Sequence, residues 1–413
     1  MRKLRIALCA LCLALLALLL PVAWRTLPVD TRPLIAEKYA GWSGVLRLWV
    51  YEGWPCGGGS IAPWLNRCVG LFEKSHPGVY IQPQYVDAGA IASLNDSGIL
   101  PPDLLLFPPG LLETPVGLAP LAVPDGLRGA LADCGRWRGE TYAAPVAMGG
   151  YLWAWNVALT DGVPETWRDG GAVLAVPTPE AWRRWDVALL ALCSGRYAAA
   201  PSGGSSARDV AAPRALDIGL AADDTPAPSP SPTPDPAATL PRRLPENFKY
   251  DGDAWRHFIN GEAAAMPVTQ REARRLQALS DQGKGPDWQL SRGDGAFSDQ
   301  LLCLAVVDRP DGAERRALCQ AFLSLLLTDE CQGGLCLASA FAVTDAESGY
   351  EPGDPLAAMD AALRDAGLCV PPVFGSGWVS AAEGIVREFI TGTGEAPSLW
   401  PRLRKLLAEY PNI

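Results

Sequence analysis

Aromatic rings and a carboxylate recur where the predicted strands of this chain end. A ligand-binding cleft combines apolar platforms with a few polar groups that fix the orientation of the ligand. Trp and Tyr rings can stack on the C–H faces of a sugar, and a carboxylate such as Glu52 can accept hydrogen bonds from its hydroxyl groups. This combination favours a small carbohydrate, with an aromatic cage for a cation as the second interpretation. The candidate ligand-binding residues at these strand ends are Tyr51, Glu52, Trp54, Phe107, Tyr151, Trp153, Met266 and Thr269.

Two further candidates, Asp294 and Phe297, lie in the segment 291–298, where the chain is expected to cross between two halves of the molecule. The competing interpretation of the aromatic candidates is structural, because aromatic residues that alternate along a strand, as over 151–155, usually belong to a core. The glycine run over 57–59 precedes a predicted helix and could present backbone N–H groups to an anion. A flexible turn explains the same run.

Few side chains are available for catalysis or metal binding. The chain has two histidines, His76 and His257, and no CxxC pair beyond its apolar N-terminal run, so the sequence predicts no metal site and no cofactor. GxSxG, phosphate-loop and HExxH motifs are absent. A hydrolase with two facing carboxylates stays open as the third functional interpretation, since sequence does not reveal such pairing. The formal charge of −10 argues against nucleic acid as a partner.

The N-terminus has the pattern of an export signal that stays in the membrane. Basic residues precede an uncharged apolar run over 6–24, which is close to the ~20 residues that span a bilayer as a helix. Pro21 stands where signal cleavage needs a small residue. We therefore predict a transmembrane signal anchor over 1–24 and a juxtamembrane linker over 25–43, with an inefficiently cleaved signal as the alternative. The positive-inside rule makes this a single-pass cell-membrane protein with its remaining residues outside the cytoplasm.

Strand and helix patterns alternate after this linker. Residues 45–51 and 79–86 have the composition of strands, and 103–107 form a short, fully apolar one. Between the first two, Ser60 could cap a helix that ends at Pro77-Gly78. Continuous apolar runs suit parallel strands covered on both faces, so the pattern predicts an open α/β sheet. The expected buried face of the helix comprises Leu65, Cys68, Val69 and Phe72.

Composition changes completely over 199–245, where Gly and Ser precede a tract of alternating prolines. Such a segment is expected to be extended or disordered, as a surface insertion, and a docking motif for another protein is the alternative. Regular patterns resume with a helix over 255–259 and a strand over 263–268, and Asp311 is predicted to open a later helix in a capping box.

The chain has eleven cysteines, and an odd number of them lies beyond the apolar N-terminal run, so these cannot all pair. We expect buried thiols with one or two disulfides. Cys331 and Cys336 are the nearest candidate pair along the chain.

Four segments, in this order and at this spacing, resemble the extracellular solute-binding proteins of ABC importers, in particular the group that includes carbohydrate binders. The strongest match is Gly44–Val79, similar to the family's opening strand, first helix and "FEKxHPGV" turn. Pro102–Phe107 is similar to the "PDV" strand, and Gly139–Asn156 to the segment that crosses between lobes. Residues 258–266 resemble the "F..GkaAM" element, and 321–332 the "FL.fLLt.E.Q" helix that follows it.

The resemblance implies an α/β protein with the two-lobed fold of periplasmic binding proteins, with the small solute held between the lobes. It places 44–147 plus 288–345 in lobe 1 and 148–287 plus 346–413 in lobe 2. ABC permease subunits are the implied partners. The implied function is capture of a solute for import, and a binding-fold protein repurposed as a membrane-tethered sensor or interaction module is the alternative.

Two features depart from the family. No small residue precedes Cys9 or Cys12, so the lipoprotein box is missing and the predicted transmembrane helix would replace it. Gly149-Gly150 stands where the family often places a ligand-contacting side chain, so the resemblance does not identify the ligand.

Overall fold

A computed structural model describes most of the chain beyond its N-terminal region. The described residues are 42–54, 59–94, 101–160, 162–163, 174–176, 198–199, 248–250, 254–292, 295–309, 312–365, 367–375, 377–378, 381 and 405–406. The predicted anchor over 1–24 and, apart from its first residue, the predicted insertion over 199–245 lie outside them. Within the described ranges, no helix is long and apolar enough to cross a membrane.

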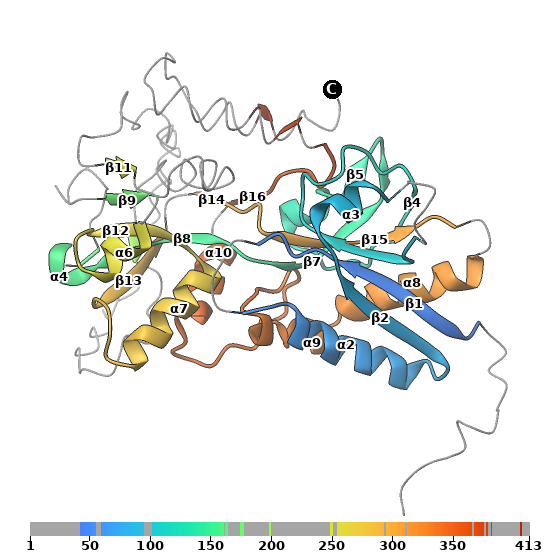
Figure 1. The fold of residues 1–413 in the computed structure, drawn as a ribbon, viewed down its shortest axis with the longest axis horizontal. Coiled ribbons are helices and arrows are strands. Elements are labelled where there is room, and N and C mark those ends of the chain that lie inside the picture. Colours follow the sequence, from blue (N-terminus) through green and yellow to red (C-terminus); the bar gives the residue numbers. More distant parts are fainter. Residues whose placement is uncertain are drawn as a thin grey trace, which may run out of the picture.

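Six strands form the first sheet, which with its surrounding segments we call lobe 1 (Figure 1). They are β1 (Gly44–Val50), β2 (Val79–Tyr85), β3 (Leu104–Phe107), β4 (Leu118–Ala119), β7 (Ala143–Met148) and β15 (Leu301–Val307). β1 is parallel to β2 and β3, whereas β15 is antiparallel to β3, β4 and β7. Pro83 lies in β2, at the edge of the sheet, where a residue without an N–H group is tolerated. The three strands predicted from the first part of the chain are therefore confirmed.

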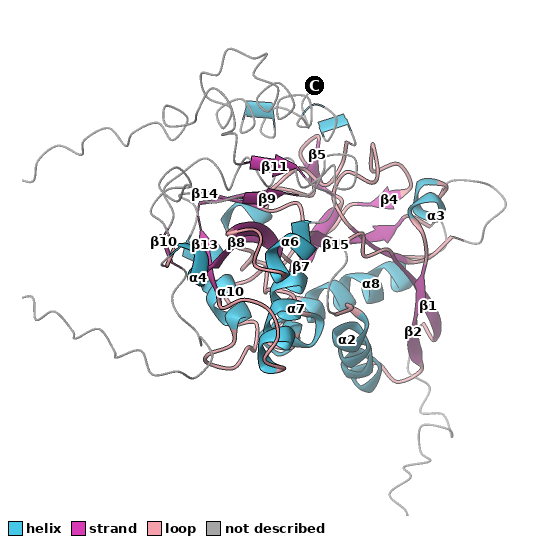
Figure 2. Cartoon of the chain, turned by 60° about the vertical axis from the view of Figure 1, so that its left-hand side comes forward, coloured by secondary structure: helices cyan, strands magenta, loops and turns pink. Residues whose placement is uncertain are grey.

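Helices α2 (Ala62–Ser75) and α8 (Ala313–Leu326) lie beside each other against this sheet, with α9 (Asp329–Gln332) following α8 (Figure 2). α2 buries the four residues predicted from its period and also Trp64. The rings of Phe72 and Phe322 meet edge-on, with centroids 5.3 Å apart, and hold the two helices together. The cap predicted at Ser60 is wrong, and Asp311, the other predicted cap, lies outside the described residues. Ser60 accepts a hydrogen bond from the Ala62 N–H at 3.2 Å, but α2 begins after Ile61, and α8 begins after Gly312 without a side-chain cap.

A second sheet of six strands, which with its helices we call lobe 2, has the order β10-β13-β8-β12-β9-β11. Its strands are β8 (Tyr151–Asn156), β9 (Leu174–Val176), β10 (Ala198–Ala199), β11 (Phe248–Tyr250), β12 (Ala265–Thr269) and β13 (Trp288–Arg292). β8 is antiparallel to both β12 and β13. Helices α4 (Val157–Thr160), α6 (Ala254–Ile259), α7 (Gln270–Asp281) and α10 (Pro355–Asp365) accompany it, and α10 packs on α7. The helix predicted over 255–259 and the strand predicted over 263–268 are α6 and β12.

Short elements complete the described fold. They are α3 (Ala88–Ala92), the 3-10 turns η2 (Gly129–Leu131) and η4 (Leu335–Ala338), the hairpin of β5 (Arg136–Trp137) and β6 (Glu140–Thr141), and the parallel pair of β14 (Gly295–Phe297) and β16 (Gly367–Cys369). In the described residues the chain passes between the two lobes four times: from β7 to β8, from β13 to β15, from α9 to α10, and from α10 back to residues 373–375, which hydrogen-bond to Gly110, Leu112 and Cys134 of lobe 1. The mixed α/β architecture that the sequence predicted is thus present.

Candidate functional site

The first two chain crossings lie side by side between the lobes. The Gly149 N–H donates to the Gln300 carbonyl at 2.6 Å, and the Ser298 hydroxyl donates to the Gly149 carbonyl at 2.7 Å. Neither glycine leaves room for a side chain: a Cβ at Gly149 would lie 2.1 Å from the Gln270 side chain, and one at Gly150 would lie 2.3 Å from Leu363. The two glycines therefore allow α7 and α10 of lobe 2 to approach the crossing closely.

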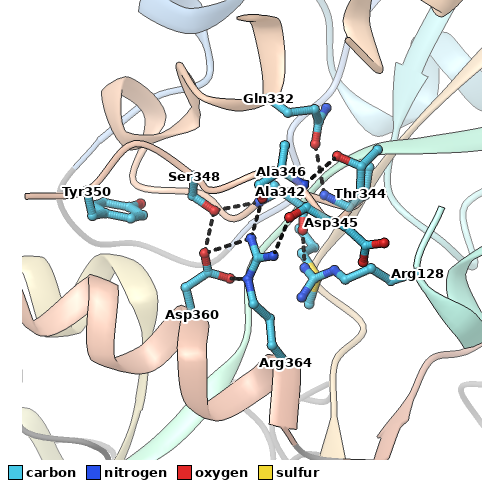
Figure 3. Close-up of polar contacts among 12 residues, drawn as sticks. Arg128, Gln332, Ala342, Thr344, Asp345, Ala346, Ser348, Tyr350, Asp360 and Arg364 are labelled. Atoms are coloured by element: carbon cyan, nitrogen blue, oxygen red, sulfur yellow. Dashed lines mark hydrogen bonds and ion pairs between the residues drawn. The ribbon is translucent and has the colours of Figure 1, made fainter. Parts of the chain in front are cut away.

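The third crossing, residues 341–350, is fixed at its lobe 1 end (Figure 3). Phe341 and Met148 exchange backbone hydrogen bonds of 2.7 and 3.0 Å, which tie this crossing to the first one. The Gln332 side chain accepts from the Val343 N–H at 2.9 Å and donates to the Val146 carbonyl at 2.9 Å. Arg128 reaches the Ala342 carbonyl from the same lobe.

Helix α10 fixes the lobe 2 end of the third crossing (Figure 3). The buried Asp360 accepts from the Ser348 hydroxyl at 2.6 Å and pairs with Arg364 at 3.1 Å. Arg364 also donates to the carbonyls of Asp345 at 3.2 Å and Ala346 at 2.5 Å. Burial, and then the positive charge of Arg364, lowers the pKa of Arg128 to about 10. The crossing thus lies between two guanidinium groups, one from each lobe.

One ion pair joins the lobes beside these crossings. Glu52 follows β1 in lobe 1, and Arg271 lies in the first turn of α7 in lobe 2; their side chains form an ion pair and a hydrogen bond. The same Glu52 oxygen accepts from the Ile61 N–H at 2.9 Å. The Arg271 guanidinium stacks over the Trp54 ring, 4.9 Å from its centroid. We call Glu52, Trp54 and Arg271 the interlobe cluster.

A capping box fixes the lobe 2 side of this cluster. The Thr269 hydroxyl accepts from the Glu272 N–H at 3.1 Å, and the Glu272 carboxylate accepts from the Thr269 N–H at 2.9 Å. This reciprocal pair starts α7 at the end of β12 and turns Gln270 and Arg271 toward lobe 1, where Gln270 accepts from the Gly150 N–H at 3.1 Å. Burial raises the pKa of Glu272 to about 7.

Several buried donors at this boundary have no hydrogen-bond partner among the described residues. They are Trp54 Nε1, Arg271 Nε and Gln270 Nε2. An unsatisfied buried donor costs roughly 1–3 kcal/mol, so a closed boundary of this composition is stabilised by any group that supplies an acceptor. Burial also lowers the pKa of Arg271 to about 10, because the residue is only 6 % exposed. A hydroxyl-rich molecule between the lobes could relieve both penalties.

Five of the predicted site residues lie at the boundary between the lobes. Glu52 and Trp54 belong to the interlobe cluster, and the half-buried Tyr51 precedes them. Thr269 is fully buried as the cap of α7, and the Tyr151 hydroxyl donates to Asp299 at 2.6 Å beside the first crossing.

The other predicted site residues lie away from this boundary or outside the description. Phe107, Trp153 and Met266 are at most 2 % exposed within their sheets. The Trp153 and Trp155 rings pack 6.0 Å apart, as in a core. Asp294 lies outside the described residues, and so does the side chain of Phe297.

Sequence reasoning missed Gln270 and Arg271. A usable signal was present, because Thr269 and Glu272 have the spacing of a capping box directly after a predicted strand. That signal predicts a helix start at the C-terminal end of β12, where a binding site collects its polar groups.

Alternative sites are weaker. A small pocket lined by Asp103, Arg309 and Arg315 lies at the beginning of β3, the end opposite to the interlobe cluster. The Asp103 carboxylate in this pocket already has partners, since it pairs with both arginines and accepts from the Arg47 N–H at 2.8 Å. Within the described ranges, no three His, Cys, Asp or Glu side chains gather as metal ligands would.

Comparison with solved structures supports the two-lobed interpretation of this fold. The chain is similar to the unliganded maltodextrin-binding protein MalE1 from L. casei BL23, with a TM-score of 0.58 and 15 % identity over 90 % of this chain and 99 % of that one. It is also similar to the GacH receptor of Streptomyces glaucescens, whose structures include complexes with acarbose (TM-score 0.54, 17 % identity, 89 % and 99 % covered). A third similar structure is the cyclic α-maltosyl-1,6-maltose binding protein from Arthrobacter globiformis (TM-score 0.56, 15 % identity, 90 % and 100 % covered).

At such low identity these likenesses show the fold, and they confirm the fold predicted from the four sequence segments. No protein-family model and no curated protein sequence matches the chain.

Proposed function

We propose that the chain binds a carbohydrate between its two lobes and presents it to an ABC permease at the outer face of the cell membrane, where residues 1–24 anchor it. It acts as a binding protein without turnover. The interlobe cluster is the observation that carries this proposal, because a carboxylate, an indole ring and a guanidinium meet there from both lobes. The ligands named for the three similar structures, which are maltodextrin, acarbose and a cyclic maltosyl-maltose, support a sugar as the solute class.

Binding would proceed by exchange of partners. When the lobes open, Arg271 separates from Glu52, and the face of Trp54 becomes available to a sugar ring. On closure, Glu52 accepts hydrogen bonds from sugar hydroxyls, while the unpartnered donors of Trp54, Gln270 and Arg271 gain oxygen acceptors. The chain crossings, among them residues 149–150, 298–300 and 341–350, limit this motion to a hinge.

A thermal-shift screen of the full chain against maltodextrins, acarbose, other sugars, amino acids and polyamines tests the proposal. One sugar class should raise the melting temperature by roughly 5 °C at 100 times its Kd, because binding then adds about 2.7 kcal/mol. Calorimetry should show that Trp54→Leu weakens the binding of that sugar at least tenfold. Trp255→Leu is the matched control, because Trp255 stacks with Arg275 at 4.4 Å within lobe 2, away from the interlobe cluster.

The screen also separates the competing functions. If no compound in the panel shifts the melting temperature, the proposal is contradicted and the tethered sensor is favoured. Conversion of a sugar into products, abolished in Glu52→Gln, would make the chain an enzyme. The permease partnership requires that cells lacking the chain lose uptake of the identified sugar, and unchanged uptake would refute it.

A further inference from the structure

Lobe 1 contains two pairs of buried cysteines, each drawn from segments far apart in sequence. Cys68 lies on α2 and Cys331 on α9, while Cys134 follows η2 and Cys303 lies in β15. All four are free thiols in this structure, and none is more than 6 % exposed. In each pair one thiol perturbs the other: Cys331 raises the pKa of Cys68, and burial, followed by Cys134, raises the pKa of Cys303. The Cys134 thiol itself donates to the Leu131 carbonyl at 3.2 Å.

The first pair is aligned by a tryptophan on the same helix. The Trp64 indole donates to the Cys331 carbonyl at 2.7 Å. Trp64 lies one turn before Cys68, so this bond holds α9 directly over the helix face that carries the Cys68 thiol. The neighbouring thiol raises the pKa of Cys68 and lowers that of Cys331, which makes Cys331 the more readily ionised thiol.

The second pair is aligned by a close backbone approach. Gly135 packs so tightly on β7 that a Cβ there would lie 1.8 Å from the Ala143 carbonyl oxygen. Two residues along the same strand, Pro145 is paired with Cys303 of β15. The Cys134 backbone therefore lies against β7, whose neighbour in the sheet is β15, the strand that carries Cys303.

We propose that Cys68 with Cys331 and Cys134 with Cys303 form two disulfides that brace lobe 1. The inference rests on the proposed location outside the cytoplasm, where disulfides persist. In the first pair, the Cys331 thiolate attacks a disulfide donor such as oxidised glutathione, forming a mixed disulfide and releasing one glutathione thiolate. The Cys68 thiolate then attacks the Cys331 sulfur and releases the second glutathione. Two cysteine thiols are oxidised, one donor disulfide is reduced, and the two protons pass to the released thiolates.

This pairing replaces the one suggested by chain proximity. Cys331 and Cys336 are neighbours in sequence, but the thiol that perturbs the pKa of Cys331 is that of Cys68, whereas the Cys336 sulfur lies against Gly349, 3.4 Å from the position of a Cβ there. Both proposed disulfides lie in lobe 1, and none is proposed among the described residues of lobe 2. Lobe 1 would therefore be the more rigid lobe during closure.

Peptide mapping of the full chain tests the proposal. The exported protein, and protein refolded from the reduced state with oxidised and reduced glutathione, are alkylated in denaturant without reductant and digested. Mass spectrometry should find the Cys68–Cys331 and Cys134–Cys303 cross-linked peptides in both samples. Reductant should lower the melting temperature by roughly 10 °C, given the long loops that the two bonds close.

Cys331→Ala should abolish the first cross-link and leave the second, and Cys319→Ala, the matched buried control, should leave both. Alkyl groups on all four cysteines, or a Cys331–Cys336 cross-link, would overturn the proposal. The mapping needs no ligand, so a failure of sugar binding would not change its result.

Discussion

Replacing Glu52 by Gln removes the charge that joins the two lobes. The variant keeps the size of the side chain and its acceptor for the Ile61 N–H, but it takes the counter-charge away from Arg271. We expect the closed arrangement to lose stability relative to the open one. Lobe 1 itself should be little affected, because its core does not involve this side chain.

The magnitude follows from the burial of the pair. The side chains of Arg271 and Glu52 are 7 % and 20 % exposed. Breaking a fully buried pair costs about 3–5 kcal/mol and breaking an exposed one up to about 1 kcal/mol, so this pair falls between, at about 2 kcal/mol. Because burial lowers the pKa of Arg271 only to about 10, the guanidinium stays charged at neutral pH and the penalty applies in full. About 2 kcal/mol changes the ratio of closed to open molecules roughly 30-fold.

Small-angle X-ray scattering of the unliganded protein measures this change. The radius of gyration should rise in Glu52→Gln and return toward that of the wild type when the sugar binds. Glu73→Gln is the matched control, since Glu73 accepts from the Ile81 N–H at 3.0 Å in lobe 1 in the way that Glu52 accepts from Ile61. Superimposable scattering curves for wild type and Glu52→Gln, or an equal expansion in Glu73→Gln, would refute the reasoning.

Three other substitutions have defined outcomes. Gly150→Ala places a methyl group against Leu363 and should lower stability by about 1–3 kcal/mol in urea unfolding, and an unchanged midpoint would contradict the close packing. Asp360→Asn leaves Arg364 without its buried partner and should cost about 2 kcal/mol, measured in the same way; a loss below 0.5 kcal/mol would mean that the third crossing is not fixed by this pair. Glu272 has a raised pKa, so the wild type should lose stability as the pH rises from about 4.5 to about 7. The variant Glu272→Gln keeps the cap and should not lose stability over this range. If the difference in melting temperature between wild type and variant does not change between pH 5 and pH 8, this reasoning is refuted.

Local patterns identified much of the fold. The period of α2, the apolar run of β3 and the strand signals of β1, β2 and β12 all depend on neighbours in sequence, so they could be read from it. The cap predicted at Ser60 was misplaced, since α2 begins after Ile61. The capping box that the structure does use, Thr269 with Glu272, has the same local signature and was overlooked.

The sequence by itself determined the α/β alternation, the glycine pair at the first crossing and the resemblance to two-lobed solute-binding proteins, because periodicity, turn residues and motif order can be followed along the chain. The tertiary structure alone decided which candidates meet. Glu52 and Arg271 are 219 positions apart, and Trp64 and Cys331 are 267 apart, so no spacing rule connects them. Likewise, Tyr151 and Trp153 are aromatic residues of the kind that stack on sugars. Only the positions of β12, β13 and Asp299 show that both are enclosed by protein.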